Sequence, residues 1–350
     1  MIFKYFPLGA LSNNSTNCQG ILTPDTIFDL RPNMYREHRN WNLYNHQLVN
    51  RGRIIDLYLS SAVLSNTKDR KIANHNKRGR PFEYSNIVIF SSYAIKCVFK
   101  LAYRQTEGLI EDITSVMKSH LCPNFRTIWY RIKTLKASGV KLLIKAQNVG
   151  NKLEVAIDST GLKDVNDGEY RTKMYMKKKN WTKFHIVVDR CTGKILNAKI
   201  TNDKIGDSPM FGKMINPIRN KISVVYGDGA YDSVKIWDWC ENNSVEGRIP
   251  VRINSSPKGN GARQNAIRKQ FGIPPTHARL GLFDSRSRRN YYYHIWRKRA
   301  GYGNRWIVEA TFASFKRMFG EAQFSKDWRM KEKESLIKTF IYNQLRPKVM

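Results

Sequence analysis

Cysteine is scarce in this 350-residue sequence, and no pattern links the few that occur. Their number is odd, none of them forms a CxxC pair, and long segments separate them: Cys18, Cys97, Cys122, Cys191 and Cys240. A disulfide framework needs paired cysteines and a zinc ribbon needs CxxC pairs, so neither is expected. We therefore expect the cysteines to be ordinary small residues of the core.

Long apolar runs are also missing. The most apolar segment is 84–99, and serine, asparagine and lysine residues interrupt it, which makes it too polar to span a bilayer. We expect this segment to be a buried helix. The opening residues, MIFKYFPLGALSNN, hold too short an apolar stretch for a secretory signal and lack a convincing cleavage site. The sequence therefore predicts a cytoplasmic protein.

Acidic residues are few: 28 Asp and Glu stand against 61 Lys and Arg, and the formal net charge is +33. Such a chain repels itself unless a polyanion neutralises it, so nucleic acid is the first partner to expect. A membrane surface is the alternative partner for so basic a chain. With 41% hydrophobic and 12% aromatic residues, the chain can bury one substantial core and a smaller accessory domain.

The first part of the chain is predicted to be helical. Residues 1–75 form an N-terminal extension in which only 42–61 has sustained helical spacing. The basic segment NHNKRGRPF, at 74–82, marks a boundary, because a residue before proline is pushed out of the helical conformation. Residues 76–147 then form a helical DNA-binding domain. Its helices are expected at 86–103, 105–117 and 124–142.

Three short helices that end in a basic amphipathic one indicate a helix-turn-helix-like unit. The last helix carries Arg131 and Lys133 among apolar residues, and both are candidate DNA contacts. Any charged surface helix alternates in this way, so a solvated face is the alternative. In the linker, Arg78 and Arg80 flank Gly79 as in an arm that enters the minor groove of DNA, although a plain basic linker fits equally well.

The periodicity changes to that of strands in the second part of the chain. The strands are expected at 153–162, 183–189, 194–200, 222–231 and 247–253. The second and third of them flank the turn RCTG and form a hairpin. A helix at 233–242, capped by Asp232 or Ser233, and a long helix containing Glu309 complete the pattern. This order of elements predicts an α/β fold with a mixed β-sheet flanked by helices.

These elements place the α/β domain at 148–340 and leave 341–350 as a C-terminal tail. Within the domain, residues 254–300 hold eleven Lys or Arg and one acid, Asp284. Aromatic residues are interleaved with them: Phe271, Phe283, Tyr291, Tyr292, Tyr293 and Trp296. We interpret this stretch as a basic insertion that touches the DNA backbone and an unpaired base. A disordered basic loop is the alternative.

Two acids stand in the apolar strands of this basic chain, where an unpaired buried carboxylate is costly or protonated. Asp158 lies in VAIDSTG, and Asp228 ends the strand of VVYGDGAYD, where sheet enzymes place their ligands. Clustered carboxylates are the ligands of Mg²⁺, and two such ions can activate an oxygen nucleophile and relieve charge on the leaving oxygen of a phosphodiester. Each acid alone is weak support, because an Asp before Gly is usually a turn residue.

A third acid, Glu309, lies in a segment, GYGNRWIVEATFASFKRMFG, that can be tested as a helix at about 100° per residue. Arg305, Glu309 and Lys316 then follow one stripe, next to a Phe-rich stripe that would pack on the sheet. A file of charges is unusual at the edge of a buried face. The alternative is an ordinary surface pair of Arg and Glu four residues apart. Asn304 can cap a helix that begins at Arg305, with Tyr302 just outside it.

The spacing of these residues resembles that of the insertion-sequence transposases of the DDE type, in the group whose third acid lies in a Y-x2-R-x3-E-x6-K motif. Tyr302, Arg305, Glu309 and Lys316 match this motif without a gap. The segments DST, DGAYDS and FKRMFGE, with YNHQLVNRG and KRGRPFEY upstream, are also similar to the fifth insertion-sequence family. The resemblance covers roughly residues 40–340.

The resemblance implies a ribonuclease H-like catalytic domain and a role for each matching residue. The catalytic, metal-binding acids are Asp158, Asp228 and Glu309. The residues that hold phosphates near the element end are Tyr302, Arg305 and Lys316. The implied cofactor is a pair of Mg²⁺ ions, for which Mn²⁺ is expected to substitute.

The implied activity is transposition. The protein would bind the terminal inverted repeats, cut the DNA to expose a 3′ hydroxyl and direct that hydroxyl at target DNA. Joining two ends requires two active sites in one assembly, so we expect a homodimer on DNA, associated with the nucleoid. Two alternatives remain: a ribonuclease H-like nuclease that cuts without joining, and a non-catalytic transposase relic that only binds DNA.

Overall fold

The computed structural model describes residues 42, 45–46, 48–49, 52–59, 67–76, 78–119, 122–135, 152–164, 181–273 and 285–346. The chain divides into two compact units, residues 1–135 with 344–350 and residues 136–343. The second unit contains the predicted α/β domain. The finer divisions that we placed after residues 75 and 147 stay predictions.

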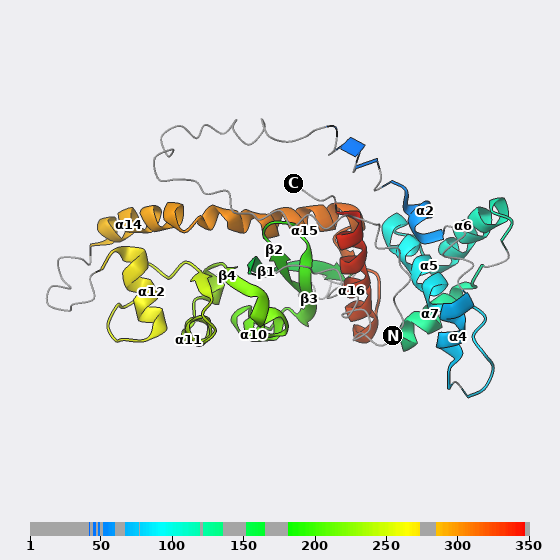
Figure 1. Ribbon diagram of the computed structural model, residues 1–350, viewed down its shortest axis with the longest axis horizontal. Coiled ribbons are helices and arrows are strands. Elements are labelled where there is room, and N and C mark those ends of the chain that lie inside the picture. Colours follow the sequence, from blue (N-terminus) through cyan, green and yellow to red (C-terminus); the bar gives the residue numbers. More distant parts are fainter. Residues whose placement is uncertain are drawn as a thin grey trace, which may run out of the picture. The chain divides into compact units, whose positions relative to one another are not determined.

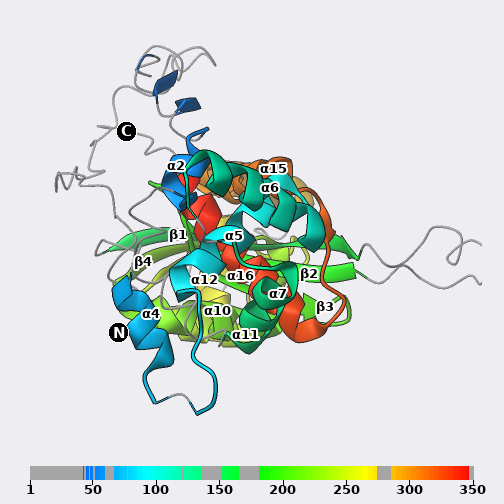
Figure 2. The same cartoon turned by 90° about the vertical axis from the view of Figure 1, so that its right-hand side faces the viewer.

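Helix α5 (Asn86–Phe99) is the central helix of the N-terminal unit, and it confirms the buried helix predicted at 84–99. Its start is capped by Ser85, whose side chain accepts a hydrogen bond of 3.2 Å from the N–H of Val88. It ends at Lys100, which takes a left-handed conformation. The surrounding helices α2 (Ile54–Leu59), α4 (Thr67–Asn74), α6 (Tyr103–Val116) and α7 (Phe125–Thr134) all contact it (Figure 2).

The three helices predicted before the α/β domain are present as α5, α6 and α7. Helix α7 is shorter than expected, because Leu135 leaves the helical conformation with ψ 132°, and residues 136–142 lie outside the described part. No single helix of the described residues is long and apolar enough to cross a membrane. Only α5 and α6 taken together pass by length and composition, as a pair bent by 111°.

The second unit is built on a mixed sheet in which the strand order is β3-β2-β1-β4-β5, with β6 beside β1. The strands are β1 (Leu153–Asp164), β2 (Trp181–Asp189), β3 (Ile195–Asn202), β4 (Ile222–Tyr226), β5 (Glu246–Arg248) and β6 (Ala322–Gln323). The first three are antiparallel neighbours, and β4 and β5 run parallel to β1. This order and these directions are those of a ribonuclease H-like fold, so the predicted fold class is confirmed.

Helices cover both faces of the sheet (Figure 1). Helices α10 (Phe211–Ile215), α11 (Val234–Asn242) and α12 (Ala262–Phe271) share a core with Val155 and Ile157 of β1. On the other face, α15 (Trp306–Phe319) packs against β1 and β2, and its Phe315 ring lies 5.0 Å from that of Phe184. Because side chains alternate along a strand, Asp158 points to the α15 face when Ile157 points to the α10 face.

Two helices make up most of the basic insertion in the part that the structure describes. Helix α12 covers 262–271, and α14 (Arg286–Arg299) leads through the 3-10 helix η7 (Tyr302–Arg305) into α15 (Figure 1). The alternative of a disordered loop is therefore wrong for these segments, while 274–284 lie outside the described residues.

Three local expectations were wrong. The strand expected at 247–253 is only the short β5, since Pro250 has no N–H with which to continue a ladder. At the start of α11, Ser233 occupies the expected N-cap position, but its side chain caps no backbone N–H and instead accepts a hydrogen bond of 3.1 Å from Ser208 Oγ. Asp232 accepts a hydrogen bond of 3.0 Å from the indole of Trp237. Residues 341–345 are not a tail but the end of α16 (Trp328–Leu345), because apolar side chains there are buried.

The described cysteines are all free. Cys97 and Cys240 are buried, as expected of small core residues, and Cys122 is half-buried. Cys191 is exposed in the hairpin turn, so the expectation was wrong there, and Cys18 lies outside the described residues.

Candidate active site

Asp158 lies in the middle of β1, and Asp228 lies beside it just past the carboxyl end of β4. In the parallel pair of β1 and β4, Ala156 is opposite Tyr226. Asp158 stands two residues further along β1, and Asp228 stands two residues past the end of β4, so the register places the two acids next to each other. The register of the sheet, which no local pattern encodes, therefore brings together two acids 70 positions apart in the chain.

Asp158 is largely buried, and its surroundings disfavour its charge. Burial raises the pKa of this carboxyl to about 6. A hydrogen bond of 2.7 Å from the N–H of Ser159 and the charge of Arg305 oppose the rise, while the charges of Asp228 and Asp207 add to it. The raised pKa of Asp158 thus comes mainly from burial, with a smaller contribution from neighbouring like charges that a cation would relieve.

Asp228 is half-buried and begins the short 3-10 helix η5 (Gly229–Tyr231). Its Oδ1 accepts a hydrogen bond of 2.9 Å from the N–H of Ala230, which is the turn role considered as the alternative for this residue. Among the described residues, no hydrogen bond reaches its Oδ2. The turn fixes the carboxylate and leaves one oxygen for a ligand.

Glu309 lies in the first turn of α15, with a side chain that is 58% exposed. Arg305 forms the predicted ion pair with it, four residues before, but this pair is not an isolated surface pair. The second guanidinium nitrogen of Arg305 contacts Asp158 Oδ2 at 3.1 Å, across 147 positions of sequence. Arg305 therefore joins the acid of the helix to the acid of the central strand.

Tyr302 ties the same turn to the loop of Asp228. Its hydroxyl donates a hydrogen bond of 3.2 Å to the carbonyl of Gly227, and its ring lies 5.6 Å from that of Trp296. Burial raises the pKa of the Tyr302 hydroxyl to about 12, so it stays a donor. Lys316, two turns beyond Glu309, makes no hydrogen bond or ion pair with these residues in the described part of the chain. The structure thus brings together Tyr302, Arg305, Glu309 and the two aspartates but not Lys316.

A further acid, Asp207, borders the cluster and was missed from the sequence. Its Oδ1 lies 3.0 Å from Lys183 Nζ and 3.5 Å from His185 Nδ1, and His185 Nε2 is 2.8 Å from Thr201 Oγ1. Burial lowers the pKa of His185 to about 4, so the ring is neutral near neutral pH. The available signal was the one used for Asp228, an acid shortly after an apolar strand.

The donors of this cluster suit a hard divalent cation, although they are not yet arranged around one. Beside these acids, the buried hydroxyl oxygen of Tyr231 has no hydrogen-bond partner among the described residues, and Asp207 Oδ1 has only its ion-pair contacts with Lys183 and His185. The pKa of the Tyr231 hydroxyl is raised mainly by burial. The charges of Asp207, Asp158 and Asp228 raise this pKa further. Within the described residues no three acidic, histidine or cysteine side chains are close enough to hold an ion, and Arg305 stands between Asp158 and Glu309.

The candidate DNA contacts of the N-terminal unit separate into two kinds. Arg131 is buried, and it donates to the carbonyl of Tyr84 (3.0 Å) and to Asn86 Oδ1 (2.6 Å), so its guanidinium holds the unit together and is not offered to DNA. Lys133 is exposed, with its Nζ 4.7 Å from the centre of the Trp129 ring.

In the linker, Arg78 and Arg80 are exposed, and Gly79 between them has φ +83°, a conformation that favours glycine. Both arginines are therefore placed where a polyanion can reach them.

Two family models with one description match this chain. A family model described as a transposase DDE domain matches residues 150–344, more than half of the chain, and a second model of the same description matches 49–167. An uncharacterized protein of Aquifex aeolicus (strain VF5) is 23% identical over 300 residues, which are 79% of this chain and 84% of that protein. A solved piggyBac transposase synaptic complex with hairpin DNA covers 84% of this chain and 74% of its own, at a TM-score of 0.39 and 11% identity.

Proposed function

Because the chain belongs to the family of transposases with a DDE domain, we propose that it binds the terminal inverted repeats of an insertion sequence, cleaves DNA at the element ends and joins the 3′ hydroxyls to target DNA. The observation that carries this proposal is the position of Arg305. It contacts Asp158 of β1 and Glu309 of α15 beside the loop of Asp228. Acids of β1 and α15 therefore meet on one arginine, beside the loop that carries the third acid.

Asp158, Asp228 and Glu309 are proposed as ligands of two Mg²⁺ ions, which Mn²⁺ would replace. When bound, the ions supply an activated oxygen nucleophile and relieve charge on the leaving oxygen. Arg305 now balances the charge of Asp158 and Glu309, so Glu309 must leave Arg305 before its carboxylate can act as a ligand. The exposure of Glu309 permits this movement, since nothing encloses its side chain.

The side chains beside the acids are proposed to hold the DNA phosphates. Once Glu309 is released, Arg305 can present its planar fork of donors to a phosphate oxygen while it stays anchored on Asp158. Tyr302 fixes the position of this turn through Gly227, next to Asp228. Lys316, further along α15, would contact a more distant phosphate of the same strand.

The N-terminal unit is proposed to locate the element ends. Its exposed groups are the arginines of the linker, Arg78 and Arg80, and Lys133 with the half-exposed ring of Trp129 on α7. Basic side chains beside an exposed ring are suited to the backbone and bases of DNA. Two chains must act together to join two ends, so the active species is proposed to be a homodimer on DNA.

The test is a joining assay with purified protein. A duplex that carries an element end, read from the DNA that flanks the gene, is incubated with a supercoiled plasmid and Mg²⁺. We expect cut ends and end-plasmid joints from the wild-type chain. Asp228→Asn and Glu309→Gln should lower both products by about 10³-fold or more, as for residues that act as one catalytic unit.

Glu241→Gln is the matched control, because it removes the charge of an exposed Glu of α11 in the same unit. This variant should cut and join as the wild type does. Cutting without joining would identify a nuclease, and end binding without either product would identify a relic. Equal activity of Glu309→Gln and Glu241→Gln would refute the assigned acids.

A further inference from the structure

The loop that follows β5 lies against the loop that carries Asp228. The N–H of Gly227 donates to the carbonyl of Arg248 at 3.4 Å, and the N–H of Arg252 donates to Asp232 Oδ2 at 3.4 Å. Between these two contacts, a Cβ built on Gly229 would meet the carbonyl of Pro250 at 3.8 Å. The loop at 249–255 therefore lies against residues 227–232, the segment that carries Asp228.

Two arginines hold this loop in place. Arg263 of α12 binds both carboxylate oxygens of Asp232, at 2.8 and 2.7 Å, and also Ser255 Oγ at 2.9 Å. Arg289 of α14 is buried, stacks on the ring of Phe271, and donates to the carbonyls of Ile253 and Ser255, at 2.5 and 2.9 Å. Side chains of α12 and α14, two helices of the basic insertion, thus hold the loop in one conformation by hydrogen bonds.

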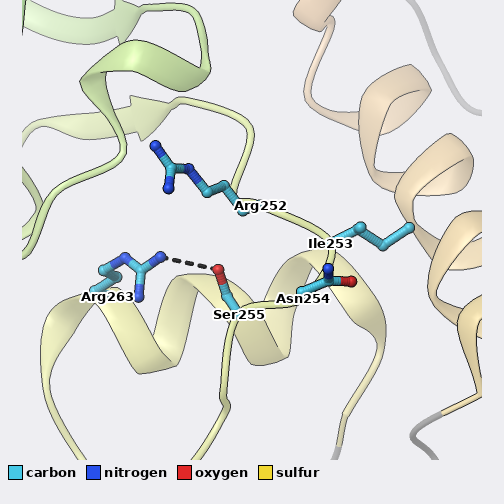
Figure 3. Close-up of a pocket in the computed structure, with 5 residues that line it drawn as sticks. All are labelled: Arg252, Ile253, Asn254, Ser255 and Arg263. Atoms are coloured by element: carbon cyan, nitrogen blue, oxygen red, sulfur yellow. Dashed lines mark hydrogen bonds between the residues drawn. The ribbon is translucent and has the colours of Figure 1, made fainter.

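An open pocket of about 450 Å³ lies at this loop, and a neighbouring one of about 200 Å³ shares two of its residues. The first is lined by Arg252, Ile253, Asn254, Ser255 and Arg263, as Figure 3 shows. Arg286 and Arg289 join Ile253 and Asn254 around the second. In Figure 3 the side chain of Arg263 points at Ser255, and that of Arg252 extends from the loop away from Ile253.

The charge of the two pockets is not balanced from within. Asp232 neutralises Arg263, and burial tends to raise the pKa of that carboxyl, but hydrogen bonds from Arg263 and Trp237 bring it below its usual value. Arg252 and Arg286 are both exposed, and neither guanidinium has a partner among the described residues. Two uncompensated cations, Arg252 of the loop and Arg286 at the start of α14, thus face solvent beside the amide of Asn254. This arrangement is suited to phosphate oxygens.

We propose that these pockets are a binding site for backbone phosphates of the DNA strand held in the active site. Asp232 is four residues from Asp228, a span of at most about 14 Å of extended chain, and a DNA strand places one phosphate for every 3.4 Å or so of helix rise. The contacted phosphates therefore lie within a few nucleotides of the bond that is cut. This inference rests on the proposed function, because the DNA strand in question is the one that is cut at the site of Asp228.

The test measures DNA affinity without catalysis. The full-length chain is titrated onto an element-end duplex in EDTA over a series of KCl concentrations. Each phosphate contact contributes about 0.9 to the slope of log K against log [KCl]. Arg252→Ala should lower this slope by about 1 and the affinity by about eightfold at about 0.1 M salt. Arg286→Ala should act similarly, and Arg252→Lys should restore the slope.

Arg219→Ala is the matched control. Arg219 is exposed in the same unit but lies before β4, at the opposite end of that strand from Asp228. It should leave the slope unchanged. If Arg252→Ala and Arg219→Ala give the same slope, the proposal is overturned.

Single neutral methylphosphonate linkages, placed one position at a time in the duplex, show whether the contacted phosphates lie on the element side or on the flanking side of the cut. A linkage that weakens wild-type binding but not that of Arg252→Ala marks the contacted position, on the element side or on the flanking side of the cut. If no such linkage exists on either side, the inference fails. Because backbone contacts do not depend on base sequence, the same comparison on a random duplex tests the pocket even where end recognition, and with it the proposed function, fails.

Discussion

Replacing Asp158 by asparagine is expected to stabilise the folded protein near neutral pH while removing a ligand from its active site. Burial and the neighbouring aspartates raise the pKa of Asp158 to about 6, against an ordinary value of 3.8. The folded state therefore prefers the protonated carboxyl, and the unfolded state releases the proton at lower pH. Asparagine has nearly the same shape and cannot ionise.

The magnitude follows from the two pKa values. At about 1.4 kcal/mol per pKa unit, the difference between 3.8 and about 6 corresponds to about 3 kcal/mol. The contribution of protonated Asp158 to the free energy of unfolding is fully present below about pH 4 and is lost as the pH rises through about 6. Relative to the wild type, Asp158→Asn should thus gain up to about 3 kcal/mol between about pH 4 and about pH 8, which is several degrees in Tm for a domain of this size.

The assay is urea unfolding of both proteins over that pH range, in EDTA. The difference between the two free energies of unfolding is the quantity to follow, because His185 acts in the opposite direction. Burial lowers its pKa from 6.5 to about 4, so its contribution to stability falls as the pH drops through that window. In the wild type the pH dependences that arise from Asp158 and His185 largely cancel. The difference in the free energy of unfolding between variant and wild type contains only the contribution of Asp158.

Two results would refute this reasoning. A difference that does not change with pH would mean that Asp158 is not disfavoured by its surroundings. Destabilisation of Asp158→Asn at every pH would mean that its contact with Arg305 outweighs the burial of its charge. Glu241→Gln, at an exposed site, should show neither behaviour and serves as the control.

Three further predictions concern the metal, the core and the N-terminal unit. Mg²⁺ at about ten times its Kd should stabilise the wild type by about 1.4 kcal/mol and Asp228→Asn by much less, in thermal unfolding with and without EDTA. Gly247→Ala should cost about 1–3 kcal/mol in urea unfolding, because its new Cβ would lie 2.9 Å from the ring of Trp237; a change below about 0.5 kcal/mol would contradict this packing. Trp129→Ala and Lys133→Ala should weaken DNA binding in a mobility-shift assay with little change in Tm, and unchanged affinity would remove α7 from the DNA surface.

Much of the fold followed from local patterns. Alternating apolar residues predicted the hairpin of β2 and β3, and the mostly apolar spacing of 84–99 predicted the buried helix α5. The Phe-rich stripe beside Glu309 correctly indicated the face that packs on the sheet. These features are repetitive over several residues, so burial imposes a visible period on them.

Element ends were less predictable. The short strand β5 and the extra turns at the end of α16 depend on which neighbours are present in space, and sequence periodicity says nothing about those. The burial of the Arg131 side chain also depends on its neighbours in space. A basic side chain on an amphipathic helix looks the same in the sequence whether it meets solvent or, as here, the carbonyl of Tyr84.

The sequence alone determined the charge of the chain, the succession of strands and helices along it, and the spacing of Tyr302, Arg305 and Glu309. These features were enough to indicate the family. Only the tertiary structure decided that Arg305 reaches Asp158 as well as Glu309, that Asp207 borders the same acids, and that the loop after β5 lies against the loop of Asp228. The physical reason is that such contacts depend on strand register and helix packing across distant parts of the chain, where the position of a charge follows from the whole fold.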